Sequence, residues 1–357
     1  MMRIRLFLPS TFAGLLLLIA VQMQAQDIHF TLHGMTPLAF NPANTGNFYG
    51  SYRVSALYRD QYRSVAGSGG FKTPTLSVDV PAIKGFREKD WVGVGLFIYS
   101  DKSGEAGLTQ GSTKISAAYH LAINKKGSTM LSVAYQTGSV GRKIADRNKL
   151  RFEDGLLSGT PDDPMSSADF GNVEDDSKGK AYTDHVGGLL LTSKYNKTDE
   201  FSIGFAMGKI GNANWSLLTG GGGDYKLHPR LHFQAGMSSV MSDKVRFSPS
   251  ITYQRVLEGS QATLVAQGMI DYLANQAKNT ILVGGLGYRS GQGIGDAIQV
   301  MVGTYIKDIK IMLGYDINIS SLSAASGSVG GFELAAQYIG KIYKRPKPDP
   351  VIFCPRF

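Results

Sequence analysis

A period-two alternation of large apolar residues with small or polar ones is the feature of this 357-residue chain that most constrains its fold. In residues 309–319, for example, Leu313 and Ile317 alternate with Asp316 and Asn318. Because successive residues of a strand point to opposite faces of a sheet, the pattern gives each strand two faces in different surroundings. A face that carries Asp and Asn is costly against hydrocarbon and favourable against a water-filled lumen. The alternation therefore favours strands that separate lipid from water.

About fourteen segments carry this pattern, and each has about ten residues, the length that a tilted strand needs to cross a bilayer. The segments lie near residues 50–62, 71–80, 90–100, 110–121, 128–140, 181–194, 200–210, 228–239, 245–256, 261–272, 279–289, 296–306, 309–319 and 331–340. Connections after even-numbered segments are mostly short, whereas those after odd-numbered segments include the long stretches 141–180 and 211–226. Outer-membrane barrels have an even number of strands, short periplasmic turns and longer outside loops. We therefore predict an all-β fold, a transmembrane antiparallel up-and-down β-barrel of about 14 strands over residues 50–340, with both termini in the periplasm.

A soluble β-sandwich or propeller is the alternative all-β fold. Its strands also alternate, but a soluble sheet puts charged side chains on its outer face. Only 18% of the residues here are charged, they gather at the ends of the segments, and the 44 Gly residues suit strands that are separated by turns. These observations favour the barrel, which must close because an open sheet edge in lipid leaves backbone groups unpaired.

The first 25 residues have the layout of a secretory signal peptide. Two arginines precede an apolar stretch of about 15 residues that ends at Ala20, and Ala25 ends a plausible cleavage site. The apolar stretch is short for a membrane-spanning helix, which takes about 20 residues, so we expect export and cleavage after Ala25. Residues 26–49 then form an N-terminal periplasmic or plug segment, and residues 341–357 form a periplasmic C-terminal tail.

The charge of the chain does not indicate nucleic acid as a partner. The formal net charge of +9 falls to +7 when Arg3 and Arg5 are removed with the signal peptide, and the basic residues are scattered among strand ends and turns. Nucleic-acid binders instead gather basic and aromatic residues on one patch. The C-terminal tail is basic and rich in Pro, which cannot extend a ladder. Its basic residues suit an acidic face of a periplasmic partner, and the candidate partner-binding residues are Lys341, Lys344, Arg345 and Lys347.

The histidines and glycines of the chain do not predict a catalytic, cofactor or metal site. The pairs His29/His33 and His228/His232 have a helix-like spacing, but on strands such residues lie about 13 Å apart, too far to share a metal. Residues 291–295 have the glycine spacing of a phosphate-binding loop, but a strand follows them in place of the helix that such a loop needs. We therefore interpret these glycines as a turn.

The acidic loop at residues 153–177 is the most charged feature of the chain. Calcium would suit its carboxylates, but the acidic residues lack a regular ligand spacing, so a solvated outside loop is the favoured interpretation. The single Cys, Cys354, excludes a disulfide within one chain. With no nucleophile–base pattern present, we expect no enzymatic activity.

Several short motifs resemble those of the PorP/SprF family of the type IX secretion system of Bacteroidetes. Asn41-Pro42-Ala43-Asn44-Thr45-Gly46 resembles the NPAxxG motif of the family, and Tyr58-Arg59-Asp60-Gln61 resembles its YRxQW motif, with Tyr62 in place of the Trp. Ser77-Val78-Asp79 precedes Pro81, which is expected at the end of the second strand, and Leu150–Asp154 resembles a recurring segment. The chain closes on Cys354-Pro355-Arg356-Phe357, an ending typical of the family.

The resemblance implies an outer-membrane component of the secretion and gliding machinery. Its partners would be outer-membrane lipid, periplasmic proteins of the PorK/PorN-type ring, a PorE-like peptidoglycan-binding protein, and cargo such as an adhesin with a type B C-terminal domain. The resemblance identifies motif residues and no contact residues, and it implies no cofactor. A passive porin or substrate-specific channel remains the alternative, since a barrel of about fourteen strands is wide enough for a lumen.

Overall fold

The structure is a computed structural model that describes residues 29–63, 69–146, 149, 181–196, 198–211, 226–258, 261–276, 280–291, 294–321 and 323–342. The predicted signal peptide, the acidic loop at 153–177 and the segment 150–154 lie outside the described residues. The same holds for the tail from residue 343 onward, which includes Lys344, Arg345, Lys347 and the closing motif from Cys354 to Phe357.

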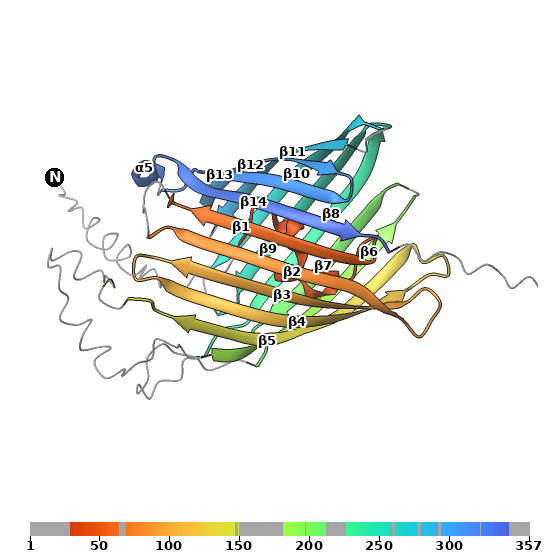
Figure 1. Ribbon diagram of the computed structural model, residues 1–357, viewed down its shortest axis with the longest axis horizontal. Coiled ribbons are helices and arrows are strands. Elements are labelled where there is room, and N and C mark those ends of the chain that lie inside the picture. Colours follow the sequence, from red (N-terminus) through yellow and green to blue (C-terminus); the bar gives the residue numbers. More distant parts are fainter. Residues whose placement is uncertain are drawn as a thin grey trace, which may run out of the picture.

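The described residues form fourteen strands that close into one antiparallel barrel (Figure 1). Each strand pairs with its neighbours in sequence, and β1 pairs with β14. The strands are β1 (Tyr52–Gln61), β2 (Phe71–Lys84), β3 (Trp91–Ser103), β4 (Leu108–Ala122), β5 (Thr129–Lys143), β6 (Ala181–Lys194), β7 (Glu200–Gly208), β8 (Arg230–Ser242), β9 (Val245–Val256), β10 (Ala262–Asn275), β11 (Thr280–Gly291), β12 (Ile294–Ile306), β13 (Ile309–Asn318) and β14 (Val329–Gly340). The predicted fold class is confirmed. A single short helix, α5 (Ser323–Ser326), precedes β14 in this part of the chain.

The two faces of each strand meet different surroundings, as the alternation predicts. On β13, Asp316 and Asn318 point into the barrel and are 1% and 2% exposed, whereas Leu313 points outward and is 40% exposed. On β4, Lys114 and His120 are likewise buried and Ile115 is exposed. The outer surface is therefore apolar, and the polar residues of the strands meet inside.

Strand boundaries differ from the predicted ones where the barrel extends beyond a bilayer. β2 continues past Pro81 to Lys84. The pairing of β2 with β3 shifts register between Pro81 and Ile83, and this irregularity accommodates the missing N–H donor of Pro81. β4 and β5 each have 15 residues, more than the roughly ten that cross a bilayer. Gly291 ends β11 and Ile294 begins β12, and the two residues between them, where a turn is expected, lie outside the described residues.

Residues 29–48 lie inside the barrel, and we call this segment the plug (Figure 1). It contains three short 3-10 helices, η1 (His33–Met35), η2 (Pro37–Ala39) and η3 (Pro42–Asn44). Phe30, Leu32, Met35 and Leu38 of the plug are each at most 3% exposed. Burial of one such side chain stabilises by about 1.5–3 kcal/mol, more than a typical neutral hydrogen bond. Apolar packing therefore stabilises the seated plug.

The plug runs along the lumen between the two ends of the barrel. We call the end where β1 begins and β14 finishes the terminal end, and the opposite end the loop end. The described chain begins at His29, which contacts Arg59 near the loop end of β1, whereas Ile342 lies at the terminal end. Both termini themselves lie outside the described residues, so the prediction that they share one side of the membrane stays a prediction. No helix in the described ranges is both long and apolar enough to span a membrane.

Candidate functional site: the plug anchors and the outer vestibule

The first contact that holds the plug is a buried charged cluster near the loop end, which we call the N-terminal anchor. Glu333 of β14 accepts hydrogen bonds from the backbone N–H groups of Thr31 (2.8 Å) and Leu32 (2.7 Å). The hydroxyl of Thr31 donates to Asp316 of β13. Two strands of the wall thus bind consecutive residues of the plug through carboxylates.

Two arginines balance the carboxylates of the N-terminal anchor. Arg59 of β1 contacts Glu333 and also donates to Asp316 at 3.0 Å. Arg289 of β11 donates to the same oxygen of Asp316 at 2.7 Å. All four charged residues are at most 4% exposed. Buried charges persist only when they are paired and hydrogen-bonded, so removal of one partner is strongly destabilising.

The Asn-Pro-Ala motif forms the middle of the plug and fits a slot in the wall. The Asn41 side chain accepts from the N–H of Ala43, which caps η3, and donates to the backbone oxygen of Leu189 on β6 at 3.0 Å. A Cβ at Gly188 would lie 2.3 Å from Asn41 Oδ1. The slot therefore exists because glycine lines it. Pro42 supplies the first position of η3, which needs no N–H donor.

The second contact, near the terminal end, is the C-terminal anchor. Asp79 of β2 accepts from the N–H of Gly46 at 2.7 Å and binds the Arg53 guanidinium with both oxygens, at 2.9 and 2.7 Å. Arg53 also donates to the backbone oxygen of Asn44 at 3.0 Å. A bidentate Arg–carboxylate pair is a strong and directional interaction. It therefore fixes the end of the plug relative to β1 and β2.

Gly46 and Gly93 allow the plug backbone to touch the wall at the C-terminal anchor. Gly46 has φ of 72°, and a Cβ there would lie 2.7 Å from the Cα of Gly93. The neighbouring carbonyl groups are bound as well: His120 binds the oxygen of Thr45 at 2.8 Å, and Trp91 donates to the oxygen of Gly46 at 3.1 Å. A position with a left-handed backbone conformation and a close backbone contact requires glycine. This explains why Gly46 stands at the last position of the NPAxxG motif.

His33 lies on η1 of the plug and not on a strand, so the strand spacing assumed for His29 and His33 is wrong. Burial lowers the pKa of His33 from its usual 6.5 to about 4, and a backbone hydrogen bond at Thr31 opposes this effect. His33 is therefore neutral at physiological pH. No group of three or more His, Cys, Asp or Glu residues suited to a metal ion occurs among the described residues.

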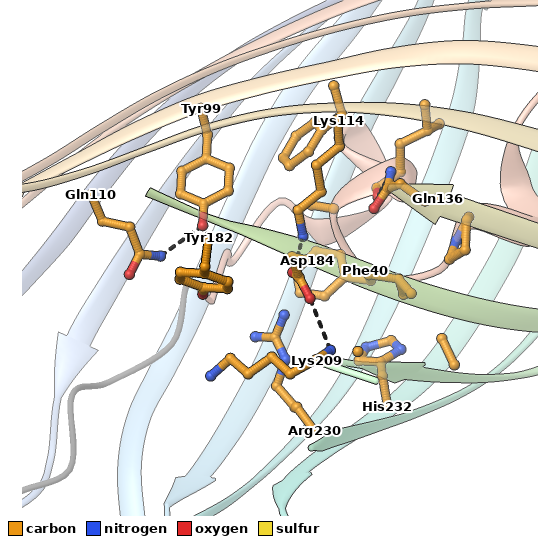
Figure 2. Close-up of a pocket in the computed structure, with 17 residues that line it drawn as sticks. Phe40, Tyr99, Gln110, Lys114, Gln136, Tyr182, Asp184, Lys209, Arg230 and His232 are labelled. Carbon is orange, nitrogen blue, oxygen red and sulfur yellow. Dashed lines mark hydrogen bonds and ion pairs between the residues drawn. The ribbon is translucent and has the colours of Figure 1, made fainter. Parts of the chain in front are cut away.

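On the loop side of the plug lies a cavity of about 40 Å³, which we call the outer vestibule (Figure 2). Its floor is formed by residues 38–42 of the plug, apart from Asn41. Lys114 of β4 binds Asp184 of β6 at 2.5 Å, and the backbone N–H of Lys209 donates to the other oxygen of Asp184 at 2.9 Å. Arg230 and His232 of β8 complete this wall of the vestibule.

A larger cavity of about 270 Å³ lies on the terminal side of the plug. It is lined by residues 31–35 of the plug and by methionines of the wall, including Met269, Met301 and Met312. Glu200 and Lys310 lie at its rim, where β7 and β13 begin. The lumen thus contains a polar cavity toward the loop end and a largely apolar cavity toward the terminal end, with the plug between them.

The structure brings together six of the motif residues identified from the sequence. Asn41, Pro42, Ala43 and Gly46 lie in the plug, and Arg59 and Asp79 bind it from the wall. Gln61 accepts from Arg59 at 3.1 Å and supports the N-terminal anchor. Tyr58 is separate from this group, because it points outward and is 39% exposed. Lys341 is exposed just after β14.

Sequence reasoning missed the anchor residues that lie outside the motifs. Glu333, Arg289 and the vestibule residues Lys114 and Asp184 were not singled out. All four are charged residues at inward positions in the span of a strand. Such residues are rare in transmembrane segments and mark functional positions, and this signal would have identified them.

A closed antiparallel barrel with an internal plug defines the class of the protein, an outer-membrane type of β-barrel. The family model described as type IX secretion system membrane protein PorP/SprF matches residues 22–338. The chain belongs to this family, as its motifs predicted.

Solved structures with a similar fold are bacterial outer-membrane barrels. The toluene transporter TodX of Pseudomonas putida matches with a TM-score of 0.50 and 12% identity, over 84% of this chain and 91% of that chain. The CymD monoaromatic hydrocarbon channel matches with a TM-score of 0.49 and 14% identity, over 87% and 94%. At these identities the likeness concerns the fold alone. No curated protein matches the chain.

Proposed function

We propose that this protein is an outer-membrane component of the type IX secretion machinery that supports export or surface attachment of cargo proteins such as adhesins. The observation that carries the proposal is the family match over residues 22–338, together with the use of the family motifs to seat a plug in the lumen. Motif residues that hold a plug suit a barrel that acts through protein contacts. The chemistry is recognition and not bond breaking.

In the proposed orientation the terminal end faces the periplasm and the loop end faces the outside. The long connections 144–180 and 209–229 both leave from the loop end, in the manner of outside loops of bacterial barrels. A signal peptide at residues 1–25 delivers the chain to the periplasm. Cargo with a type B C-terminal domain meets the loop end, and periplasmic proteins of the PorK/PorN-type ring and a PorE-like protein meet the terminal end.

Deletion of the gene, followed by proteomics of the cell surface and the medium, tests this function. Selective loss of one adhesin from the surface supports a dedicated role, and loss of many proteins supports a general role. An unchanged set of surface and secreted proteins would refute the secretion function.

A passive porin or substrate-specific channel is the second candidate, and the cavities on both sides of the plug are the observation that favours it. A plug anchored at both ends favours the secretion role instead, because both anchors must break before the lumen opens. Planar-bilayer recording of the purified protein separates the two. A steady open-pore current supports the channel, and a closed barrel supports the secretion component.

The C-terminal tail is the proposed docking segment for an acidic periplasmic partner. Lys341, Lys344, Arg345 and Lys347 would provide the charges, with the main effect on encounter rate and specificity. Deletion of residues 341–357 should leave an inserted barrel that no longer co-purifies with periplasmic secretion proteins. Undiminished co-purification by the truncated barrel would contradict this role of the tail.

A further inference from the structure

The outer wall of the barrel carries a row of cations at the loop end of the adjacent strands β2–β5 (Figure 1). Lys72 of β2 stands directly opposite Lys102 of β3. The same rung continues through Thr109 of β4 to Lys143 of β5, and Lys102 and Lys143 are exposed. Thr73, the neighbour of Lys72 in sequence, is buried inside, so the alternation of the strand turns Lys72 outward. We call Lys72, Lys102 and Lys143 the lysine row.

The lysine row has no neutralising partner among the described residues. None of its members makes an ion pair or a hydrogen bond in this part of the chain. Asp60 of β1 lies on the same rung, opposite Lys72, but its ion pair at 3.7 Å is with Arg63. Like charges that stand directly opposite each other destabilise a sheet. An anion bound between Lys72 and Lys102 would offset this repulsion.

The lysine row lies just above the apolar surface that faces the lipid. Leu76 of β2 and Ile98 of β3 are large exposed apolar residues, and each lies four positions from the lysine of its strand. Four residues span about 14 Å along a strand, which is about 10 Å along the axis of a barrel whose strands tilt by roughly 40°. The headgroup layer is about 5–8 Å thick on each side of the hydrocarbon core. Because lysine side chains are long and flexible, Lys72 and Lys102 reach this layer.

Small and hydroxyl-bearing residues separate the lysine row from the apolar surface on β3–β5, and we call them the polar shelf. They occupy outward positions on two consecutive rungs and are Ser100, Gly111, Thr113, Ser139 and Gly141. The opposite side of the barrel differs, because the rung of Tyr288, Ile298 and Ile317 carries large exposed apolar residues close to the loop end. Hydroxyl groups of Ser and Thr both donate and accept hydrogen bonds. The polar shelf therefore suits a headgroup of sugar rings, and not acyl chains.

We propose that the lysine row and the polar shelf bind the headgroup of a phosphorylated glycolipid. Lys72 and Lys102 bind one phosphate between them, since lysine binds phosphate as a point charge, and Lys143 meets an anionic group farther from the membrane. The apolar surface around Leu76 and Ile98 receives the acyl chains, which favours a lipid over free phosphate. Assignment of this lipid to the outer leaflet rests on the proposed orientation, in which the loop end faces the outside.

Native mass spectrometry of the purified full-length protein, freed of lipid in detergent micelles, tests the proposal. The probe is diphosphoryl lipid A, and the reference is the same acylated disaccharide without its phosphates. Attraction to an anionic lipid headgroup contributes about fivefold in affinity for each lysine. We expect saturable binding of lipid A and about 25-fold weaker binding of the reference. Lys72→Gln and Lys102→Gln should each weaken lipid A binding about fivefold, and the double variant about 25-fold, with binding of the reference unchanged.

Arg255→Gln is the matched control. Arg255 of β9 is an exposed cation on the outer wall near the same end of the barrel, and its neighbours on the rung are Leu231 and Ala262. No second cation stands beside it on this rung, so its loss removes one charge without touching the site. Lipid A affinity should therefore stay unchanged. The heat-modifiable mobility of each variant on gels verifies that the barrel is folded.

Lipid A binding that the double variant leaves unchanged, or that Arg255→Gln weakens as much as Lys102→Gln, would overturn the proposal. Equal affinity for phosphatidylglycerol, which has a phosphate and no disaccharide, would overturn the glycolipid assignment, and displacement of lipid A by equimolar inorganic phosphate would assign the site to the free ion.

The acidic stretch at residues 153–177, which follows β5 in the sequence, is the other source of negative charge for the lysine row. Absence of lipid A binding to the folded wild-type protein, with binding gained on deletion of residues 153–177, would assign the row to this stretch and overturn the proposal. All of these results come from purified protein. They are therefore separable from failure of the secretion function, which surface proteomics measures in cells.

Discussion

The carboxylate of Glu333 receives two backbone N–H groups of the plug, and its replacement by Gln weakens these contacts together with its contact to Arg59. The substitution preserves the shape of the side chain and leaves Asp316 to pair with Arg59. The amide of Gln has one acceptor oxygen in place of two, so either Thr31 or Leu32 loses its bond. A hydrogen bond to a charged group contributes about 1.5–3 kcal/mol. A free energy of 1.36 kcal/mol corresponds to a factor of ten. The state in which Thr31 and Leu32 are detached from the wall should therefore become about ten to a hundred times more populated.

Hydrogen exchange followed by mass spectrometry, on the protein in detergent micelles, measures this change at Thr31 and Leu32. Exchange at Gly46, which the C-terminal anchor holds, should change much less. Gln337→Ala is the matched control, because Gln337 lies on the same strand and donates to Ser55 of the wall, with no bond to the plug. Equal exchange at Thr31 and Leu32 in a folded Glu333→Gln protein would refute the role of this carboxylate as an anchor.

Two further perturbations address the other parts of the plug. Gly93→Ala would place a Cβ 2.1 Å from the oxygen of Thr45, and overpacking of this kind costs about 1–3 kcal/mol. Exchange at Gly46 should therefore accelerate, whereas Gly284→Ala on β11, where a Cβ meets open space, should leave it unchanged. The second perturbation is acidification: the folded pKa of His33, about 4, lies below its unfolded value of 6.5. Plug seating should be constant above pH 6.5 and weaken as pH falls from 6.5 to about 4, because the unseated segment binds the proton more tightly. His33→Gln should reduce this pH dependence of exchange at Met35, and an identical profile in both proteins would contradict the assignment.

The wall of the barrel follows from the sequence because lipid and water impose a simple rule on it. Leu313 and Asp316 are sorted to opposite faces by solvation alone, and this sorting needs no knowledge of distant residues. The strand ends are less determined, since a ladder continues beyond the membrane wherever neighbouring strands still pair. This is why β2 passes Pro81 and reaches Lys84.

The interior of the barrel was not predictable in the same way. The helices η1, η2 and η3 have three residues each, too few for any periodicity to appear. The contacts of the plug with the wall join residues up to about 300 positions apart, such as Thr31 and Glu333. The family resemblance identified Asn41, Gly46 and Asp79 as motif residues. Their role in holding the plug is visible only in the fold, where Asp79 accepts a hydrogen bond from Gly46, 33 positions away.

Arg59 and Glu333 stand directly opposite each other on β1 and β14, the two strands whose pairing closes the barrel. The carboxylate that holds the first residues of the plug therefore belongs to the last strand to be synthesised. An unclosed sheet leaves Thr31 and Leu32 without their acceptor and exposes Phe30 and Leu32, which closure covers. Seating of the plug therefore requires a closed barrel, and in an unclosed sheet the apolar side chains of Phe30 and Leu32 remain uncovered.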